Sequence, residues 1–169
     1  NEEVAKRKAA EDGLFFYPFS GNAAADRKFT KASFIGLDLS HDRFDIARAI
    51  MEGVAFQAIW LMESFKTKPS KAGLKLAGGA SKSALWCQMV ADITNLPVRI
   101  PEVADLACVG AAIMAGTGCG IYSSVEEGYK RLAVRERVIQ PDPERAALYE
   151  KLYAEYKKCA GLLGTVYGL

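Results

Sequence analysis

Residues 76–86 read LAGGASKSALW, and the rest of the chain is interpreted from this stretch. The apolar run Leu74–Ala77 predicts a short strand, and apolar residues at helical spacing after Ser83 predict a helix. The turn Gly78–Ser83 therefore has the strand–turn–helix context of a phosphate-binding loop. Glycines let the backbone approach a nucleotide closely, and N–H groups at a helix start can meet an anion. Spacing alone leaves a plain connecting turn as the alternative and slightly favours it.

The composition is that of one soluble globular domain. The chain has 169 residues, 50% of them hydrophobic and 25% charged, and 22 basic against 20 acidic residues leave a net charge of +2. This balance predicts neither a nucleic acid nor a membrane as partner, and no apolar stretch approaches the ~18 residues of a membrane span. Because the chain starts at Asn1 without a signal pattern, we expect a fragment of a longer cytoplasmic protein.

The cysteines and the single histidine give no sign of a metal site. Four cysteines, at 87, 108, 119 and 159, lie in apolar, helix-like contexts without any C-x-x-C spacing. This pattern predicts buried, reduced thiols rather than metal ligands or disulfides. His41 is the one histidine of the sequence, which excludes a multi-histidine site.

Helical and strand patterns alternate along the chain, which predicts an α/β fold with a partly parallel sheet. We expect helices over Asn1–Ala10, Arg43–Lys66 with Ser40 as N-cap, Ser83–Thr94 ended by Asn95, Leu106–Thr117, Ser124–Ala133, and from Asp142-Pro143 onward. Strands are expected at Leu14–Tyr17, Phe34–Leu37, Leu74–Ala77, Pro97–Pro101 and Val134–Ile139. Gly53 costs its helix about 1 kcal/mol of propensity, which a close backbone contact would offset.

Several common catalytic motifs are missing. The sequence has no G-x-x-x-x-G-K-[ST] phosphate loop and no G-x-S-x-G nucleophile motif. The run GTGCG at Gly116–Gly120 suggests a dinucleotide-binding oxidoreductase as a weaker alternative. That run follows a predicted helix rather than a strand, so glycines at a helix C-terminus explain it better.

Four stretches, in order, resemble the FGGY carbohydrate kinases, the family of xylulokinase, gluconate kinase and glycerol kinase. They are RAIMEGVAF (Arg48–Phe56), LAGGASKSALWCQMVADITNLPV (Leu76–Val98), DLACVGAAIMAGTGCGIYSSVEEG (Asp105–Gly128) and PDPERAALYEKLYAEY (Pro141–Tyr156). The resemblance covers most of the chain from about Phe15 onward. It implies an actin-like ATPase fold of the ribonuclease H type. Residues 1–169 would be part of the C-terminal, nucleotide-side domain, with the N-terminal domain absent.

The resemblance implies ATP-dependent phosphorylation of a sugar or polyol hydroxyl, with Mg²⁺ bridging the phosphates and a xylulose-like pentulose favoured. In the family the catalytic aspartate and most sugar contacts lie outside the region matched here. We therefore expect no catalytic residue and no metal ligand in this chain, and no turnover by the chain alone. The expected partners are ATP or ADP and the sugar, and a homodimer stays open.

The resemblance assigns the nucleotide turn residue by residue. Gly79 corresponds to the glycine whose backbone approaches the nucleotide, and Ser83 stands where glycerol kinases place an asparagine near adenine. Gly78, Ala80 and Ser81 complete the loop. Lys82 is expected to point to solvent, with an orientation toward the nucleotide as the alternative. Gly110–Ala112 matches a small-residue stretch that we expect to pack tightly beside the site.

One segment departs from the family pattern. Many members carry P-Y-L-x-G-E-R-[ST]-P, but Ser20–Arg27 lacks the G-E-R-[ST]-P core. This departure argues against an ordinary xylulokinase and leaves the autoinducer-phosphorylating kinases as a candidate subgroup. It also favours the main alternative function, a non-catalytic actin-like module that senses nucleotide or binds a partner.

Overall fold

Two parallel strands and the helix that joins them form the centre of the fold. In this computed structural model the described residues are 2–18, 31–63, 73–103 and 105–166. Strand β3 (Leu74–Lys75) pairs in parallel with β4 (Val98–Pro101), and β5 (Glu136–Ile139) pairs antiparallel with the other edge of β4. Helix α4 (Ala84–Thr94) connects β3 to β4. The predicted partly parallel α/β arrangement is confirmed.

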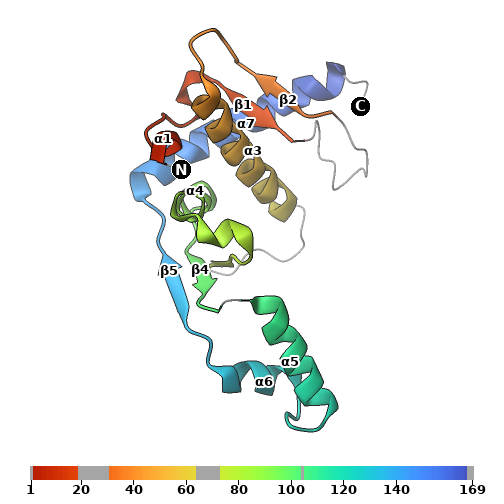
Figure 1. Cartoon of the computed structure of the whole chain (residues 1–169). Coiled ribbons are helices and arrows are strands. Elements are labelled where there is room, and N and C mark those ends of the chain that lie inside the picture. Colours follow the sequence, from red (N-terminus) through yellow and green to blue (C-terminus); the bar gives the residue numbers. More distant parts are fainter. Residues whose placement is uncertain (1, 19–30, 64–72, 104, 167–169) are drawn as a thin grey trace.

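A second, two-stranded sheet packs on the longest helices. Strands β1 (Phe15–Tyr17) and β2 (Ser33–Ile35) pair antiparallel, and β1 lies against α3 (Arg43–Glu63). Figure 1 shows α3, α7 (Pro143–Val166) and this sheet as the upper body of the molecule. The helices α5 (Leu106–Gly118) and α6 (Val125–Leu132) form the lower end, which β4 and β5 join to the body.

Aromatic side chains form the main core between β1, α3 and α7. The Tyr17 and Tyr156 rings stack with centroids 4.3 Å apart, and the Tyr17 hydroxyl donates to the Tyr156 carbonyl oxygen at 3.0 Å. Phe56 of α3 packs against Tyr156, with centroids 5.0 Å apart. A smaller core under the three-stranded sheet contains Cys87, Ala91, Val98 and Ile100. Aromatic pairs of this kind contribute beyond their burial of area.

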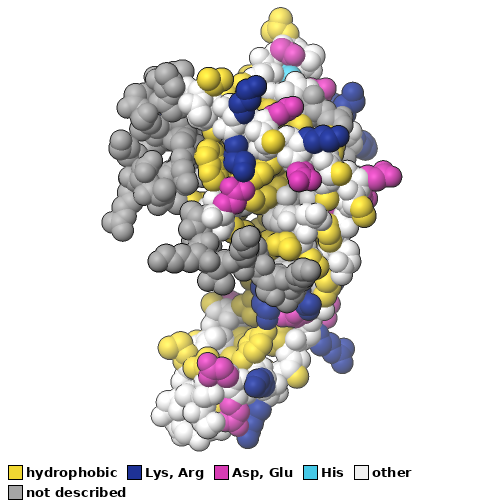
Figure 2. All heavy atoms as spheres, turned by 180° about the vertical axis from the view of Figure 1, so that it is seen from behind, with side chains coloured by type: hydrophobic (Ala, Val, Ile, Leu, Met, Phe, Trp, Pro, Cys, Tyr) yellow, Lys and Arg dark blue, Asp and Glu magenta, His cyan; other side chains and the backbone are white. Residues whose placement is uncertain are grey.

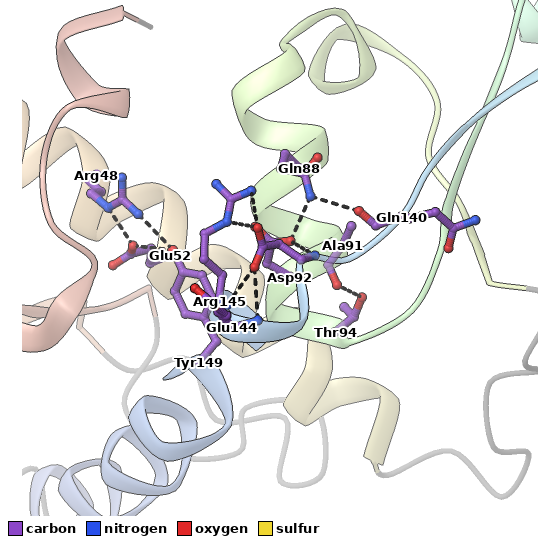
Figure 3. A network of polar contacts seen from close by, with 11 residues as sticks. Arg48, Glu52, Gln88, Ala91, Asp92, Thr94, Gln140, Glu144, Arg145 and Tyr149 are labelled. Atoms are coloured by element: carbon purple, nitrogen blue, oxygen red, sulfur yellow. Dashed lines mark hydrogen bonds and ion pairs between the residues drawn. The ribbon is translucent and has the colours of Figure 1, made fainter. Parts of the chain in front are cut away.

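A buried carboxylate joins three segments of the body. Glu52 of α3 is 2% exposed and accepts hydrogen bonds from the Arg48 guanidinium (2.8 Å), the Tyr149 hydroxyl of α7 (2.8 Å) and the Ala10 N–H (3.1 Å). Arg48 also donates to the Val4 carbonyl in helix α1 (Glu2–Ala5). Figure 3 shows Arg48, Glu52 and Tyr149 grouped in this way. Because buried charges need such partners, these contacts fix the N-terminal segment on α3.

A second buried carboxylate fixes α4 to α7. Asp92 of α4 is 2% exposed and lies 3.1 Å from the Arg145 guanidinium. It also accepts from the Gln88 amide and from the Asp142 N–H, both at 2.8 Å (Figure 3). Helix α4, which follows the Gly78–Ser83 turn, is therefore held against the last helix by charge-assisted hydrogen bonds, which are stronger than neutral ones.

Most predicted helix ends are confirmed. The Ser83 hydroxyl accepts from the Trp86 N–H, Asn95 ends α4 in the left-handed conformation, and the Ser124 hydroxyl accepts from the Glu127 N–H. Asp142 accepts from two N–H groups of the first turn of α7, which begins at Pro143. These ends follow from local hydrogen bonding, which sequence patterns capture well.

The predicted N-cap of the long helix is wrong. Asp42, not Ser40, accepts from the N–H groups of Phe44 and Asp45, and Asp45 in turn accepts from the Asp42 N–H. Ser40 instead donates through its N–H and its hydroxyl to the carboxylate of Asp38. Helix α3 reaches Glu63, and its predicted end at Lys66 lies outside the described residues, as does Ser20–Arg27.

The N-terminal helix is shorter than predicted. It ends at Ala5, and a 3₁₀ turn, η1 (Ala10–Asp12), follows before Gly13 stops it with φ 78°. Tertiary contacts with α3 explain the shorter helix. The Val4 carbonyl accepts a hydrogen bond from the Arg48 guanidinium, and the Ala10 N–H donates to the Glu52 carboxylate. These bonds replace the hydrogen bonds that a continuing helix would make.

Two expectations about burial are also corrected. All four cysteines are unpaired as predicted, but Cys108 and Cys119 are exposed and Cys159 is partly exposed, so that Cys87 alone is buried. Helix α5 packs mainly on α6, and the Gly110–Ala112 stretch lies on its open side rather than in a tight contact. A methyl group at Gly110 would meet no atom.

Substitution of Gly53 tests the close contact between α3 and β1. A methyl group at Gly53 would overlap the carbonyl oxygen of Phe16, which confirms the expected close backbone approach. Gly53→Ala should therefore lower the free energy of unfolding by about 1–3 kcal/mol, despite the better helix propensity of alanine. Gly161→Ala in α7, where the methyl would meet no atom, should raise it by up to about 1 kcal/mol. Urea denaturation measures both, and equal effects would contradict the packing argument.

The contribution of Glu52 to the free energy of unfolding should depend on pH. Burial raises the pKa of Glu52 above its ordinary value of 4.5, although its three donors act in the opposite direction. Folded Glu52 therefore holds a proton to higher pH than unfolded Glu52, so its contribution to stability falls as pH rises above 4.5. Urea denaturation at a series of pH values should show that the free energy of unfolding of the wild type, minus that of Glu52→Gln, decreases upward from pH 4.5. An increase would mean that the donors outweigh burial.

Candidate functional site

The loops that follow β3 and β4 enclose a hollow of about 640 Å³. Because the two strands are parallel, their carboxyl ends meet at one edge of the sheet, where ligands bind in open α/β sheets. The lining residues are Ala77, Gly78, Gly79, Ser81 and Lys82 after β3, Ile100 and Pro101 at the end of β4, Val103 and Asp105 from the loop after β4, and Leu106 and Ala107 at the start of α5. The volume lies in the range of small-molecule sites.

Gly78 gives the first loop its shape. Its φ of 80° and ψ of −161° belong to a region that essentially only glycine adopts, and the 3₁₀ turn η2 (Gly79–Lys82) follows directly. The Ser81 hydroxyl donates to the Gly78 carbonyl at 2.7 Å, and the thiol of buried Cys87 lies under the turn, 3.4 Å from the Ser81 carbonyl oxygen. The loop is thus fixed by bonds to its own backbone and to α4.

Three of the five residues predicted to bind nucleotide line the hollow. Gly78, Gly79 and Ser81 are among the lining residues, whereas Ala80 and Ser83 are not. Ser83 caps α4 with its hydroxyl, and its N–H donates to the Ala80 carbonyl. A side chain added at Gly79 would meet no protein atom. Gly79 therefore offers its backbone to the open hollow, as a close approach to a ligand requires.

Sequence reasoning missed the second wall of the hollow. Lys82, expected to point to solvent, is exposed yet lines the hollow, and Pro101, Val103 and Leu106 supply an apolar side opposite the glycines. The signal that could have found this wall is the parallel arrangement itself. A loop after one parallel strand implies that the loop after its neighbour lies beside it.

The two sides of the hollow differ in charge. Asp105 accepts hydrogen bonds from the N–H groups of Cys108 and Ala107, and these bonds hold the pKa of its carboxyl below the usual value. Its negative charge at the start of α5 disfavours a phosphate there. Lys82 is the cation among the lining residues, and it stands on the glycine side. An anionic group therefore fits the side of Gly78–Lys82, and a flat apolar group fits the side of Ile100–Leu106.

A second hollow of about 280 Å³ between α4, α7 and the N-terminal segment is a weaker candidate. Its arginines are already paired, Arg7 with Asp42, Arg48 with Glu52 and Arg145 with Asp92. A ligand there would have to displace carboxylates. In the described part of the chain no group of three or more metal-ligating side chains converges, and no helix is long and apolar enough to cross a membrane.

Comparisons with known proteins identify the family. The sequence profile of the FGGY family of carbohydrate kinases, C-terminal domain, matches residues 1–119. The chain belongs to this family. The FGGY membership confirms the predicted resemblance and excludes the oxidoreductase alternative, and the GTGCG run ends α5 with Gly120 at φ 77°.

Curated FGGY relatives include L-xylulose kinases and autoinducer-2 kinases. The chain is 32% identical over 158 residues to the L-xylulose/3-keto-L-gulonate kinase of Escherichia coli K12, covering 93% of this chain and 32% of that protein. It is 38% identical over 140 residues to the autoinducer-2 kinase of the same strain, covering 78% of this chain and 26% of that protein. The chain thus spans about a third or less of the length of these relatives.

Solved structures confirm the predicted actin-like kinase fold. The xylulose kinase of Lactobacillus acidophilus superposes with a TM-score of 0.82 at 25% identity, covering 99% of this chain and 34% of that one. The glycerol kinase of Plasmodium falciparum, solved with ADP, has a TM-score of 0.74 at 26% identity, covering 95% of this chain and 32% of that one.

Gly79 gives a test of the hollow. Gly79→Val should weaken ATP binding to the full-length kinase by about tenfold or more, equivalent to about 1.4 kcal/mol, because the branched side chain projects where a ligand must approach. Ala80→Val, in the same turn but not lining the hollow, should leave the affinity unchanged. Titration calorimetry measures binding, and circular dichroism checks that the fold is retained. Unchanged affinity in Gly79→Val would show that the loop is only a turn.

Proposed function

We propose that this chain is part of the C-terminal domain of an ATP-dependent sugar kinase and supplies one wall of its nucleotide site. The parent enzyme transfers the γ-phosphoryl group of ATP to a hydroxyl of a sugar or polyol. The observation that carries the proposal is the hollow at the carboxyl ends of β3 and β4, lined by Gly78 and Gly79, in a chain of the FGGY family. An ADP-bound glycerol kinase shares the fold.

We propose a xylulose-like pentulose as the substrate. The curated relatives include L-xylulose kinases from three bacteria, and several structural neighbours are xylulose kinases. Autoinducer-2 is the second candidate, because the autoinducer-2 kinases reach 38% identity, although over a shorter part of the chain. The residues of this chain that line the hollow serve the nucleotide, so they do not distinguish the two acceptors.

The residues of the chain act by binding and positioning. Phosphoryl transfer depends mainly on positioning and on electrostatic stabilisation of the transferred group. The backbone of Gly78 and Gly79 approaches the phosphates, Lys82 attracts them, and the apolar side around Val103 and Leu106 receives the base. Asp105 stays ionised at the start of α5 and keeps the phosphates on the glycine side.

The hollow does not itself fit Mg²⁺. Asp105 is the one carboxylate among its lining residues, and the same oxygen, Oδ1, already accepts two backbone N–H groups. Mg²⁺ prefers several oxygen ligands, including carboxylates and phosphates. Any magnesium that accompanies ATP therefore depends on the nucleotide and on residues of the parent enzyme outside this hollow.

The direct test is an assay of the full-length kinase with ATP. Release of ADP is measured against a panel of pentuloses, hexuloses and polyols, with autoinducer-2 as a separate arm. We expect release to depend on the acceptor and to be fastest with xylulose. In the Gly79→Val variant the KM for ATP should rise by about tenfold while the KM for the sugar stays unchanged, because the substitution touches only the nucleotide wall.

Two outcomes would contradict the proposal. Fastest release with autoinducer-2 would replace the pentulose by that acceptor and keep the kinase. The absence of acceptor-stimulated release across the whole panel would reject the kinase and favour a non-catalytic actin-like module. The isolated chain serves as the negative control, because we expect it to show no turnover.

A further inference from the structure

The two sides of the hollow at the ends of β3 and β4 are anchored in different ways. The Gly78–Lys82 loop leads into α4, which Asp92 holds on α7. Asp105–Ala107 lies at the start of α5, and α5 packs mainly on α6. The chain enters this α5–α6 unit (residues 105–132) from the end of β4 and leaves it into β5, as Figure 1 shows. The position of the second side of the hollow therefore depends on how the α5–α6 unit is held on the sheet.

The face of the sheet that is turned away from α4 carries charged side chains. The two residues of β4 that flank Arg99 are buried under α4, so Arg99 lies on the other face, beside its cross-strand partner Lys75 of β3. Two like charges at this spacing repel each other. Glu136 of β5 compensates them, because its carboxylate lies 2.8 Å from the Lys75 ammonium and 3.5 Å from the Arg99 guanidinium. The hydrogen bond from Lys75 holds the pKa of the Glu136 carboxyl below its usual value.

Tyr129 of α6 joins this charged group from the α5–α6 unit. The Lys75 ammonium donates to the Tyr129 hydroxyl at 2.6 Å and lies 4.9 Å from the centre of the Tyr129 ring. The Tyr129 hydroxyl in turn donates to the Glu136 carboxylate at 3.5 Å. Figure 2 shows charged side chains of both signs at the level where the lower end of the molecule meets the body. The contact thus connects α6 to both outer strands of the sheet, β3 and β5.

The chain connections by themselves do not fix the orientation of the α5–α6 unit. The Glu102 N–H donates to the Arg135 carbonyl at 2.8 Å, which joins the two connecting segments to each other. A rotation of the unit about these segments would keep that bond, but it would separate Tyr129 from the sheet. The Tyr129 contact therefore opposes such a rotation, and with it a change in the width of the hollow.

We propose that Tyr129 and Lys75 are positioning residues of the nucleotide site, which set the separation of its two sides. Lys75 lies on the strand that leads into the Gly78–Lys82 loop, and Tyr129 lies on the helix that packs on α5. Neither residue is among those that line the hollow, so both act through the elements that do. Groups that bind a ligand must be held within about 0.5 Å of their productive positions. This inference rests on the proposed function of the hollow as a nucleotide site.

Two substitutions remove the contact from its two ends. Tyr129→Phe removes the hydroxyl and changes no charge, and Lys75→Met removes the ammonium. In the full-length kinase each should raise the Kd for ATP, measured by titration calorimetry, by about two- to fivefold, which is the range that an exposed polar contact can contribute. The double variant should bind ATP no more weakly than the weaker single variant, because both changes remove the same contact. Lys75→Arg should keep the wild-type Kd, since a guanidinium can donate to both acceptors and stack on the ring.

Arg131→Met is the matched control. Arg131 pairs with Glu127 inside α6 at 3.1 Å, so this variant also removes one cation and one exposed ion pair, but no contact with the sheet. It should leave the Kd for ATP unchanged. In the kinase assay, Tyr129→Phe should raise the KM for ATP by the same factor as the Kd, while kcat and the KM for the sugar stay unchanged. The thermal unfolding midpoint should be unaltered in all these variants, because exposed pairs contribute little to stability.

The outcomes separate the positioning role from the nucleotide site itself. Unchanged ATP affinity in Tyr129→Phe and Lys75→Met, together with weaker binding in Gly79→Val, would overturn the positioning role and leave the nucleotide site in place. Equal weakening in Arg131→Met would also overturn it, because the effect would then come from charge or from the stability of α6. If Gly79→Val binds ATP like the wild type as well, the hollow is not the nucleotide site and the inference fails with it.

Discussion

The parallel pairing of β3 with β4 is the constraint on which the rest of the structure depends. Parallel neighbours cannot be joined by a tight turn, so the chain must leave β3, cross as α4 and return to β4. The same geometry brings the loops after both strands to one edge. A glycine loop and the capped start of α5 therefore face each other across a hollow, although about 25 residues separate them in the sequence.

Two buried carboxylates turn this crossover into a rigid wall. Asp92 holds α4 on the first turn of α7, and Glu52 holds α3 on Tyr149 one turn further along α7. Burying either carboxylate without partners would destabilise the fold. Each carboxylate accepts hydrogen bonds from donors on more than one segment. Because the donors that compensate each buried charge come from different elements, they fix the position of α4 relative to the two long helices. The Gly78–Lys82 loop, which precedes α4, inherits that position.

The sequence predicts well those features, such as helix ends, that depend on a few neighbouring residues. Ser83, Asn95, Ser124 and Asp142-Pro143 were assigned correctly because each end is set by hydrogen bonds within one turn. The N-terminal helix was overextended because Glu52, far along the chain, takes the Ala10 N–H. Ser40 was preferred to Asp42 because both are good N-caps, and only the reciprocal bond with Asp45 distinguishes them. Lys82 is exposed, and its place in the lining could not be predicted from the sequence because the second wall of the hollow comes from another strand.

The burial of α5 could not be read from its sequence for a further reason. A helix that is apolar on all sides predicts burial on all sides, yet α6 covers only one of them here. The start of this helix also forms half of the hollow, so the open side of the helix borders on the hollow. The hollow takes both of its loops from one sheet edge, and a nucleotide lying there would still face outward on its remaining side.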